Sequence, residues 1–222
     1  IRDVTEIRRQ ERELVSKNAT IREIHHRVKN NLQTVASLLR IQGRRSKSDE
    51  VKDALSQAMR RVEAIAVVHD ALASGLAQTV NFDEVAARVA PLAAEVAGTG
   101  GPVVRPTIQG EFGELPSEFA TPLAVVITEL ITNAVEHGLK DTDKGEVRLI
   151  ATRGDTTLRV VVADNGPGFE PGTVGQGLGT QIIRTLVENE LSATIEWTRG
   201  AHGGTEVVID IPLRFIQGPR RA

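Results

Sequence analysis

Two adjacent histidines, His25 and His26, lie in the charged run between Glu23 and Leu32, where an imidazole can act as a nucleophile. The apolar residues around them recur at intervals of three and four, which is typical of an amphipathic helix. With about 100° of rotation per residue, His25 falls at the margin of the apolar stripe, and His26 falls on the polar face beside Asn30. We therefore expect His26 to face solvent and His25 to be packed.

A second group, Glu129, Asn133 and His137, is spaced at intervals of four residues. On a helix these side chains share one face. A carboxylate, an amide and an imidazole arranged in this way can hold a hydrated Mg²⁺ and the phosphates it carries. Taken alone, the pattern is explained better by a solvated polar face.

Two glycine-containing segments follow. In 164–168 (Asp-Asn-Gly-Pro-Gly) a carboxylate after a predicted strand can accept a hydrogen bond from an exocyclic amine, while glycine lets the backbone turn beneath a ring. Segment 175–179 (Gly-Gln-Gly-Leu-Gly) leads into a predicted helix, whose N-terminal N–H groups suit an anion. It is no Walker loop, because Gly-Lys-Ser/Thr is absent. Singly, each segment is equally a simple turn or a flexible loop.

The 222 residues are 40% hydrophobic, carry a net charge of -2 and include no cysteine. These values predict an ordinary soluble chain of one or two domains, without a disulfide scaffold or a cysteine-based metal site. The charge shows no preference for nucleic acid or membrane, and no apolar run approaches the roughly 18 residues of a membrane span. We expect a cytoplasmic protein that binds neither.

Residues 2–76 predict helix only, with one helix to about Ile41, a break at Gly43, and a second helix from Asp49 to Ala73. The apolar stripe of the first helix alone represents roughly 10–15 kcal/mol of burial as an upper estimate. A single hairpin covers only part of it, so we expect a homodimer, a four-helix bundle of two hairpins.

Residues 79–213 predict a two-layer α/β sandwich, because helices and strands alternate. The expected helices are 81–97, 117–139 and 179–190, and the expected strands are 103–109, 147–151, 158–163, 194–197 and 206–211.

Together and in this order, segments 129–137, 164–168 and 175–179 resemble the N, G1 and G2 boxes of the GHKL ATPase superfamily, and 203–205 resembles its late Gly-Gly-Thr. The run 23–32 resembles the phosphoacceptor box of the second HisKA class of sensor histidine kinases, close to the HWE group. Within that class the chain looks most like the soluble PdtaS-type kinases.

The resemblance implies an α+β chain in which an antiparallel helical hairpin forms a dimeric four-helix bundle and precedes a Bergerat (GHKL) α/β sandwich. It divides the chain into a signalling helix (1–20), a dimerisation and phosphotransfer domain (21–77), an ATP-binding domain (78–216) and a loose tail (217–222). An upstream sensor domain is expected to be missing.

The same resemblance implies ATP and Mg²⁺ as cofactors, with His26, Arg27, Asn30 and Glu129 in the catalytic machinery. Glu129 and Asn133 are expected at the metal, and Asp164 at the adenine amine. The expected nucleotide contacts are Asn133, His137, Asp164, Gly166, Gly168, Gly175, Gly177, Leu178, Gly179 and Thr205.

Ordinary HisKA proteins place an acid directly after the phosphoacceptor, but this chain has Arg27. Because arginine cannot serve as a general base, Glu23 and Glu129 are the candidates. A second departure is Thr180, where a leucine is usual.

The implied activity is that of a cytoplasmic sensor kinase core, which phosphorylates itself on His26 and passes the phosphoryl group to an aspartate of a response regulator. The resemblance to PdtaS-type kinases implies a regulator with an ANTAR output domain. Two alternatives stay open: a GHKL serine kinase of the anti-sigma type, and a non-enzymatic dimerisation scaffold that retains the nucleotide fold.

Overall fold

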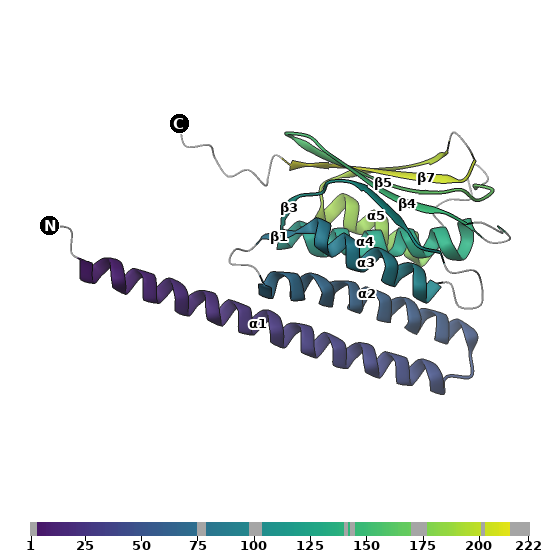
Figure 1. The fold of residues 1–222 in the computed structure, drawn as a ribbon. Helices are drawn as coiled ribbons and strands as arrows, with labels where there is room; N and C mark the ends of the chain where they lie inside the picture. Colours follow the sequence, from purple (N-terminus) through teal and green to yellow (C-terminus); the bar gives the residue numbers. More distant parts are fainter. Residues whose placement is uncertain are drawn as a thin grey trace.

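The computed structural model describes residues 4–74, 79–97, 104–139, 142, 145–169, 177–200 and 203–213. They form a long helical hairpin followed by an α/β unit (Figure 1). The layers follow one another from the sheet, through the helices that cover it, to the second and then the first helix of the hairpin. The α+β architecture is as predicted from the sequence.

The hairpin consists of α1 (Val4–Arg45) and α2 (Asp49–Ser74). Both helices lie where they were predicted, but α1 does not end at Gly43. Gly43 instead lies against α2, where an added Cβ atom would be 3.9 Å from the Cβ of Leu55. A glycine inside a helix costs only about 1 kcal/mol relative to alanine, and packing between the helices offsets this cost.

Ion pairs tie the two helices together beside a narrow apolar seam. Lys29 donates to Asp70 at 2.6 Å and Arg40 to Glu63 at 3.0 Å, and the small side chain of Ala36 is buried between these pairs. Partly exposed pairs of this kind are each worth roughly 1 kcal/mol or less. They set the alignment of the helices more than they determine the stability of the hairpin.

Five strands form the main sheet, in the spatial order β2 (Thr107–Gly110), β4 (Val147–Arg153), β5 (Thr157–Asp164), β7 (Thr205–Pro212) and β6 (Thr194–Arg199). β2 and β4 are parallel, and the other neighbours are antiparallel. Alternate side chains of β4 and β5 are buried, so one face of the sheet packs on helices. Those helices are α3 (Phe82–Ala97), α4 (Ser117–Asn133) and α5 (Leu178–Thr185).

Two short strands were not predicted. β1 (Thr79–Asn81) and β3 (Glu114–Pro116) pair antiparallel beside the main layers. Strands of three residues are too short to show the alternation on which the prediction relied. The strand expected from Val103 begins instead at Thr107, and residues 101–103 lie outside the described residues.

The helices α4 and α5 each continue into a π turn, η1 (Ala134–Gly138) and η2 (Leu186–Glu190). In η1 the N–H of Leu139 donates to the carbonyl oxygen of Ala134 at 2.8 Å. A π turn changes the direction in which the following side chains point, and such turns are common at functional sites. Here η1 carries His137.

Helix α4 is the centre of the core. Together with η1 it forms a segment, Ser117–Gly138, that is long and apolar enough to cross a membrane, with a mean hydropathy of 1.3. The expectation that no segment approaches this composition was therefore wrong. Inside this protein 72% of its apolar 18-residue window is buried, which is the usual situation of a core helix.

The hairpin and the α/β unit share one hydrophobic core. Val67, Val68 and Leu72 of α2 belong to the same buried cluster as Phe82 of α3 and Ile127 of α4. The expected domain boundary at 77/78 and the expected tail at 217–222 lie outside the described residues. Within the described residues α2 is part of the packing that supports the site.

Candidate nucleotide-binding site

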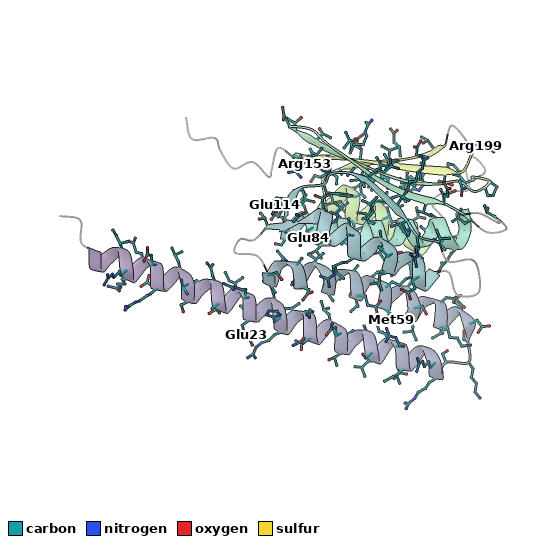
Figure 2. All side chains as sticks on the ribbon, in the orientation of Figure 1. Glu23, Met59, Glu84, Glu114, Arg153 and Arg199 are labelled. Carbon is teal, nitrogen blue, oxygen red and sulfur yellow. The ribbon has the colours of Figure 1, made fainter. Side chains whose placement is uncertain are left out.

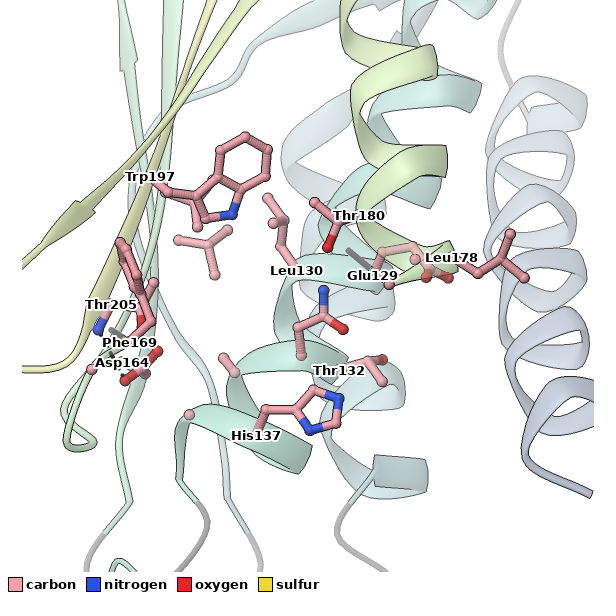
Figure 3. Close-up of a pocket in the computed structure, with 18 of the residues that line it drawn as sticks. Glu129, Leu130, Thr132, His137, Asp164, Phe169, Leu178, Thr180, Trp197 and Thr205 are labelled. Atoms are coloured by element: carbon pink, nitrogen blue, oxygen red, sulfur yellow. Dashed lines mark hydrogen bonds between the residues drawn. The ribbon is translucent and has the colours of Figure 1, made fainter. Parts of the chain in front are cut away.

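A cavity of about 490 Å³ opens between α4 with η1, the sheet and the start of α5 (Figure 3). This volume is in the range of small-molecule sites, about 300–1,000 Å³. Most of the predicted site residues line it: Glu129, Asn133, His137, Asp164, Gly168, Gly177, Leu178, Gly179 and Thr205. Gly166 does not line it, and Gly175 lies outside the described residues.

Asp164 lies at the end of β5 with 8% of its surface exposed. Its Oδ1 accepts the backbone N–H groups of Gly166 at 2.9 Å and Thr205 at 3.2 Å. Gly204 has a φ of 79°, and a Cβ atom there would come within 1.9 Å of the Asp164 carbonyl oxygen. Only glycine fits this approach, so the two strand ends hold the carboxylate in one orientation.

Gly166 serves a different purpose from the one expected. A Cβ atom at this position would lie 1.6 Å from the carbonyl oxygen of Gly138. Gly166 therefore allows the loop after β5 to pack directly on η1. It supports the wall of the pocket through this packing and does not line the pocket itself.

At the opposite end of the pocket, α5 begins beside Glu129 and Asn133. A Cβ atom on Gly179 would lie 3.1 Å from Glu129 Oε2 and 3.9 Å from Asn133 Oδ1. The first N–H groups of this helix have no partner within the helix and suit the oxygens of a phosphate. This end of the pocket therefore combines anion donors with oxygen ligands for a cation.

Glu129 is buried, with 4% of its surface exposed, and it is paired. Arg61 of α2 donates from Nε to Oε1 at 2.8 Å and from Nη2 to Oε2 at 3.0 Å. A buried carboxylate needs such a partner, because an uncompensated charge is costly away from water. Arg61 was not predicted from the sequence, because no local pattern links two residues that are 68 positions apart.

Apolar side chains form a wall on the sheet side of the pocket, the side on which Asp164 also lies (Figure 3), and this wall was not predicted from the sequence. Trp197, the only tryptophan of the chain, contributes its ring, over which the Arg184 guanidinium lies 4.6 Å from the centroid. Such a wall suits the face of a planar ring. The remaining apolar lining comes from Leu130, Ala134, Val162, Phe169 and Val207, and two further polar residues are Gln57 and Thr180.

The two histidines of α1 lie as the helical periodicity predicts. His26 is exposed, whereas His25 is half-buried with its Nδ1 3.0 Å from Nδ1 of His69 on α2. Burial lowers the pKa of His25, and the neighbouring His26 lowers it further. Burial likewise lowers the pKa of His69, with a smaller contribution from His25. Of the three rings, His26 alone is exposed to solvent.

The polar surroundings of His26 are also exposed. Arg27 Nε donates to Glu23 Oε1 at 2.8 Å, and Asn30 faces solvent. Figure 2 shows Glu23 on the side of α1 away from the α/β unit. Among the described residues, none of the pocket lining comes from α1. His26 and the pocket are therefore separate in this arrangement.

A two-layer sandwich with this pocket has the fold and site of a GHKL-type ATPase domain. A family profile described as histidine kinase, HisKA_2, matches residues 23–95. A second, described as histidine kinase-, DNA gyrase B-, and HSP90-like ATPase, matches residues 119–215. The chain belongs to the histidine kinase family.

Individual relatives agree with this assignment. The chain is 47% identical over 217 residues to the sensor histidine kinase PdtaS of Mycolicibacterium smegmatis, an alignment covering 96% of this chain and 43% of that protein. It thus spans less than half the length of that relative. The solved histidine kinase domain of the Erythrobacter litoralis EL346 blue-light activated kinase matches with a TM-score of 0.63 and 30% identity, over 90% of this chain and 94% of that one.

Proposed function

We propose that this chain is the kinase core of a two-component sensor, which uses ATP and Mg²⁺ to phosphorylate His26 and then passes the phosphoryl group to an aspartate of a response regulator. The observation that carries the proposal is the combination of a solvent-facing His26 on the hairpin with a pocket whose two ends suit an adenine and a polyphosphate.

For the adenine we assign Asp164 and the apolar wall around Trp197. The Asp164 Oδ1 atom already accepts two backbone N–H groups, so the second oxygen is the acceptor for the exocyclic amine. The ring then lies between that carboxylate and the apolar side chains, with Thr205 beside it. His137, at the exposed edge of the pocket, is assigned to the ribose and phosphate region.

For Mg²⁺ we assign Asn133, whose side-chain oxygen lies near the start of α5. Mg²⁺ requires oxygen ligands and usually keeps several waters besides phosphate oxygens. Asn133 fits this requirement. Glu129 fits it less well, because both of its oxygens accept hydrogen bonds from Arg61. The ion neutralises phosphate charge when it is bound.

The transfer itself is a displacement at phosphorus. A ring nitrogen of His26 forms the bond to the γ-phosphorus while the bond to the β,γ-bridging oxygen breaks, and ADP leaves. The other ring nitrogen gives up its proton. We assign its acceptance to Glu129, which lies at the phosphate end of the pocket, whereas Glu23 already pairs with Arg27 on the outer face of α1.

Because no described pocket residue comes from α1, transfer requires either a rearrangement of the α/β unit on the hairpin or the pocket of a second copy. We propose a homodimer through the hairpin. An apolar flank of α1 and α2 lies exposed beside the contact between these helices, and pairing two hairpins would bury it. Its residues are Ile21, Ile24, Val35, Leu38, Ile41 and Val51.

The remaining assignments follow from the family. We propose a cytoplasmic location and a receiver domain as the partner, with the ANTAR type of regulator as the first to be tested. The part of α1 before residue 21 extends past the end of α2, since His25 already lies opposite His69, five residues before α2 ends (Figure 1). We assign this extension to the transmission of the input signal.

The test is incubation with ATP labelled at the γ-phosphate. We expect the wild-type chain to acquire label that acid removes and base does not, and His26→Gln to acquire none. His25→Gln serves as the neighbouring control and should still be labelled. Equal labelling of wild type and His26→Gln would remove His26 from the mechanism.

The same experiment separates the two alternatives. A serine kinase would place acid-stable, base-labile label on a partner protein and none on His26. A scaffold would bind nucleotide without transferring phosphate.

A further inference from the structure

The second helix of the hairpin reaches the nucleotide site. Gln57 of α2 lines the pocket together with Glu129 and Asn133. Arg61 lies one helical turn further along the same face, and its guanidinium donates two hydrogen bonds to Glu129, of 2.8 and 3.0 Å. The phosphate end of the pocket is therefore bounded by a helix that does not belong to the α/β sandwich.

The contact is buried and has fixed geometry. The side chains of Arg61 and Glu129 are 18% and 5% exposed. A guanidinium that donates through two nitrogens of one rigid plane sets both the position and the plane of the carboxylate. Each carboxylate oxygen keeps a second acceptor direction. Glu129 can therefore accept one more hydrogen bond from a group that enters the pocket.

The preceding residue anchors the same turn of α2. Arg60 is 6% exposed and pairs with Glu136 of η1 at 3.3 Å. Two consecutive arginines thus fix α2 to α4 and its π turn. The guanidinium of Arg61 also compensates the Glu129 charge, which otherwise repels a polyphosphate at the start of α5.

We propose that Arg61 is a positioning residue for phosphoryl transfer, which holds the Glu129 carboxylate at the phosphate end so that the hairpin completes the active site. The proposal rests on the proposed function. It assigns to α2 a part in catalysis besides packing and dimerisation.

The experiment compares rates of self-labelling and nucleotide affinities of the chain. In Arg61→Gln we expect the maximal rate to fall about 10- to 100-fold, the range expected for a misplaced catalytic group, while the affinity for ADP changes less than about threefold. Arg61→Lys keeps the positive charge but not the planar pair of donor nitrogens, and it should recover part of the rate. A variant that only loosens the fold would lose rate and affinity together.

A double-mutant cycle with Glu129→Gln makes the test specific. If Arg61 acts through Glu129, Arg61→Gln causes no further loss in the Glu129→Gln background. The double variant also removes the unpaired buried carboxylate, so it remains informative if Arg61→Gln alone fails to fold. Arg159→Gln is the matched control, because Arg159 forms the same kind of bidentate hydrogen-bonded pair with Asp210 in the sheet.

An unchanged or faster rate in Arg61→Gln would overturn the proposal, the faster rate identifying the pair as a restraint on the kinase. Independent losses in the cycle would do the same. If the wild type itself acquires no label, the proposed function fails and this role with it. A labelled wild type with an equally active Arg61→Gln overturns only the role of Arg61.

Discussion

At the scale of single residues, His25 and His26 differ through one step of helical rotation. His26 is exposed, whereas His25 shares a hydrogen bond with His69 at 3.0 Å. That bond needs one Nδ1 atom as donor and the other as acceptor, so at least one ring must be neutral. Asp70, next to His69, is held by Lys29 and Arg88, which lower its pKa, with Lys29 the larger cause. The charge of this neighbouring carboxylate is therefore already compensated by two cations.

This pair predicts a pH dependence of stability. The pKa values of His25 and His69 lie below the value of 6.5 for the unfolded chain, so the unfolded state takes up protons first as the pH falls. The free energy of unfolding should decrease as the pH drops through about 6.5. Urea unfolding at about pH 7.5 and about pH 5.5 measures the slope. His69→Gln should reduce this slope, and a slope equal to that of the wild type would contradict the prediction.

At the scale of elements, the long helices and the main hairpins could be predicted from the sequence because their periodicity is local. The three-residue strands β1 and β3 were missed because three residues are too few to show the alternation of apolar and polar side chains that marks a strand. In the site, Glu129, Asn133 and Asp164 were predicted from their spacing and order, and all three line the pocket. Arg61 and Trp197 were not, because their positions depend on how separate elements pack. Gly166 was expected to contact the nucleotide, but it does not line the pocket.

The exposed apolar residues on the flank of α1 predict that two copies of the chain pair through this surface. Leu38 is 55% exposed on that flank, and in a symmetric pair each copy would bury it. Leu38→Glu should weaken the dimer about 100-fold or more, because it places a charge in an apolar contact. Light scattering across a range of concentrations measures the change. Gln33→Glu, on the opposite flank, should leave the dimer intact, and a Leu38→Glu variant that remains dimeric would place the contact elsewhere.

At the scale of the whole molecule, the hairpin and the α/β unit are one packed body. Leu72 of α2 is 2% exposed and lies in the cluster that also contains Phe82 and Ile127. The buried pairs of Arg60 and Arg61 cross the same boundary. We therefore expect the described parts to unfold together rather than as two domains.

Calorimetry tests this expectation through Leu72→Ala. Removing the side chain should cost about 2–5 kcal/mol through lost burial and the cavity left behind. The wild type and the variant should each show one transition, with that of the variant moved to lower temperature. Leu14→Ala, at an exposed position of α1, should shift it little. Two peaks, only one of which moves, would indicate independently folding halves.

Trp197 makes the chain its own optical reporter. With one tryptophan and no tyrosine in the sequence, the emission of the protein comes from a single indole beside the cavity, already covered on one side by the Arg184 cation. A ligand stacked nearby quenches or shifts that light directly, so occupancy can be followed in solution without attaching a dye.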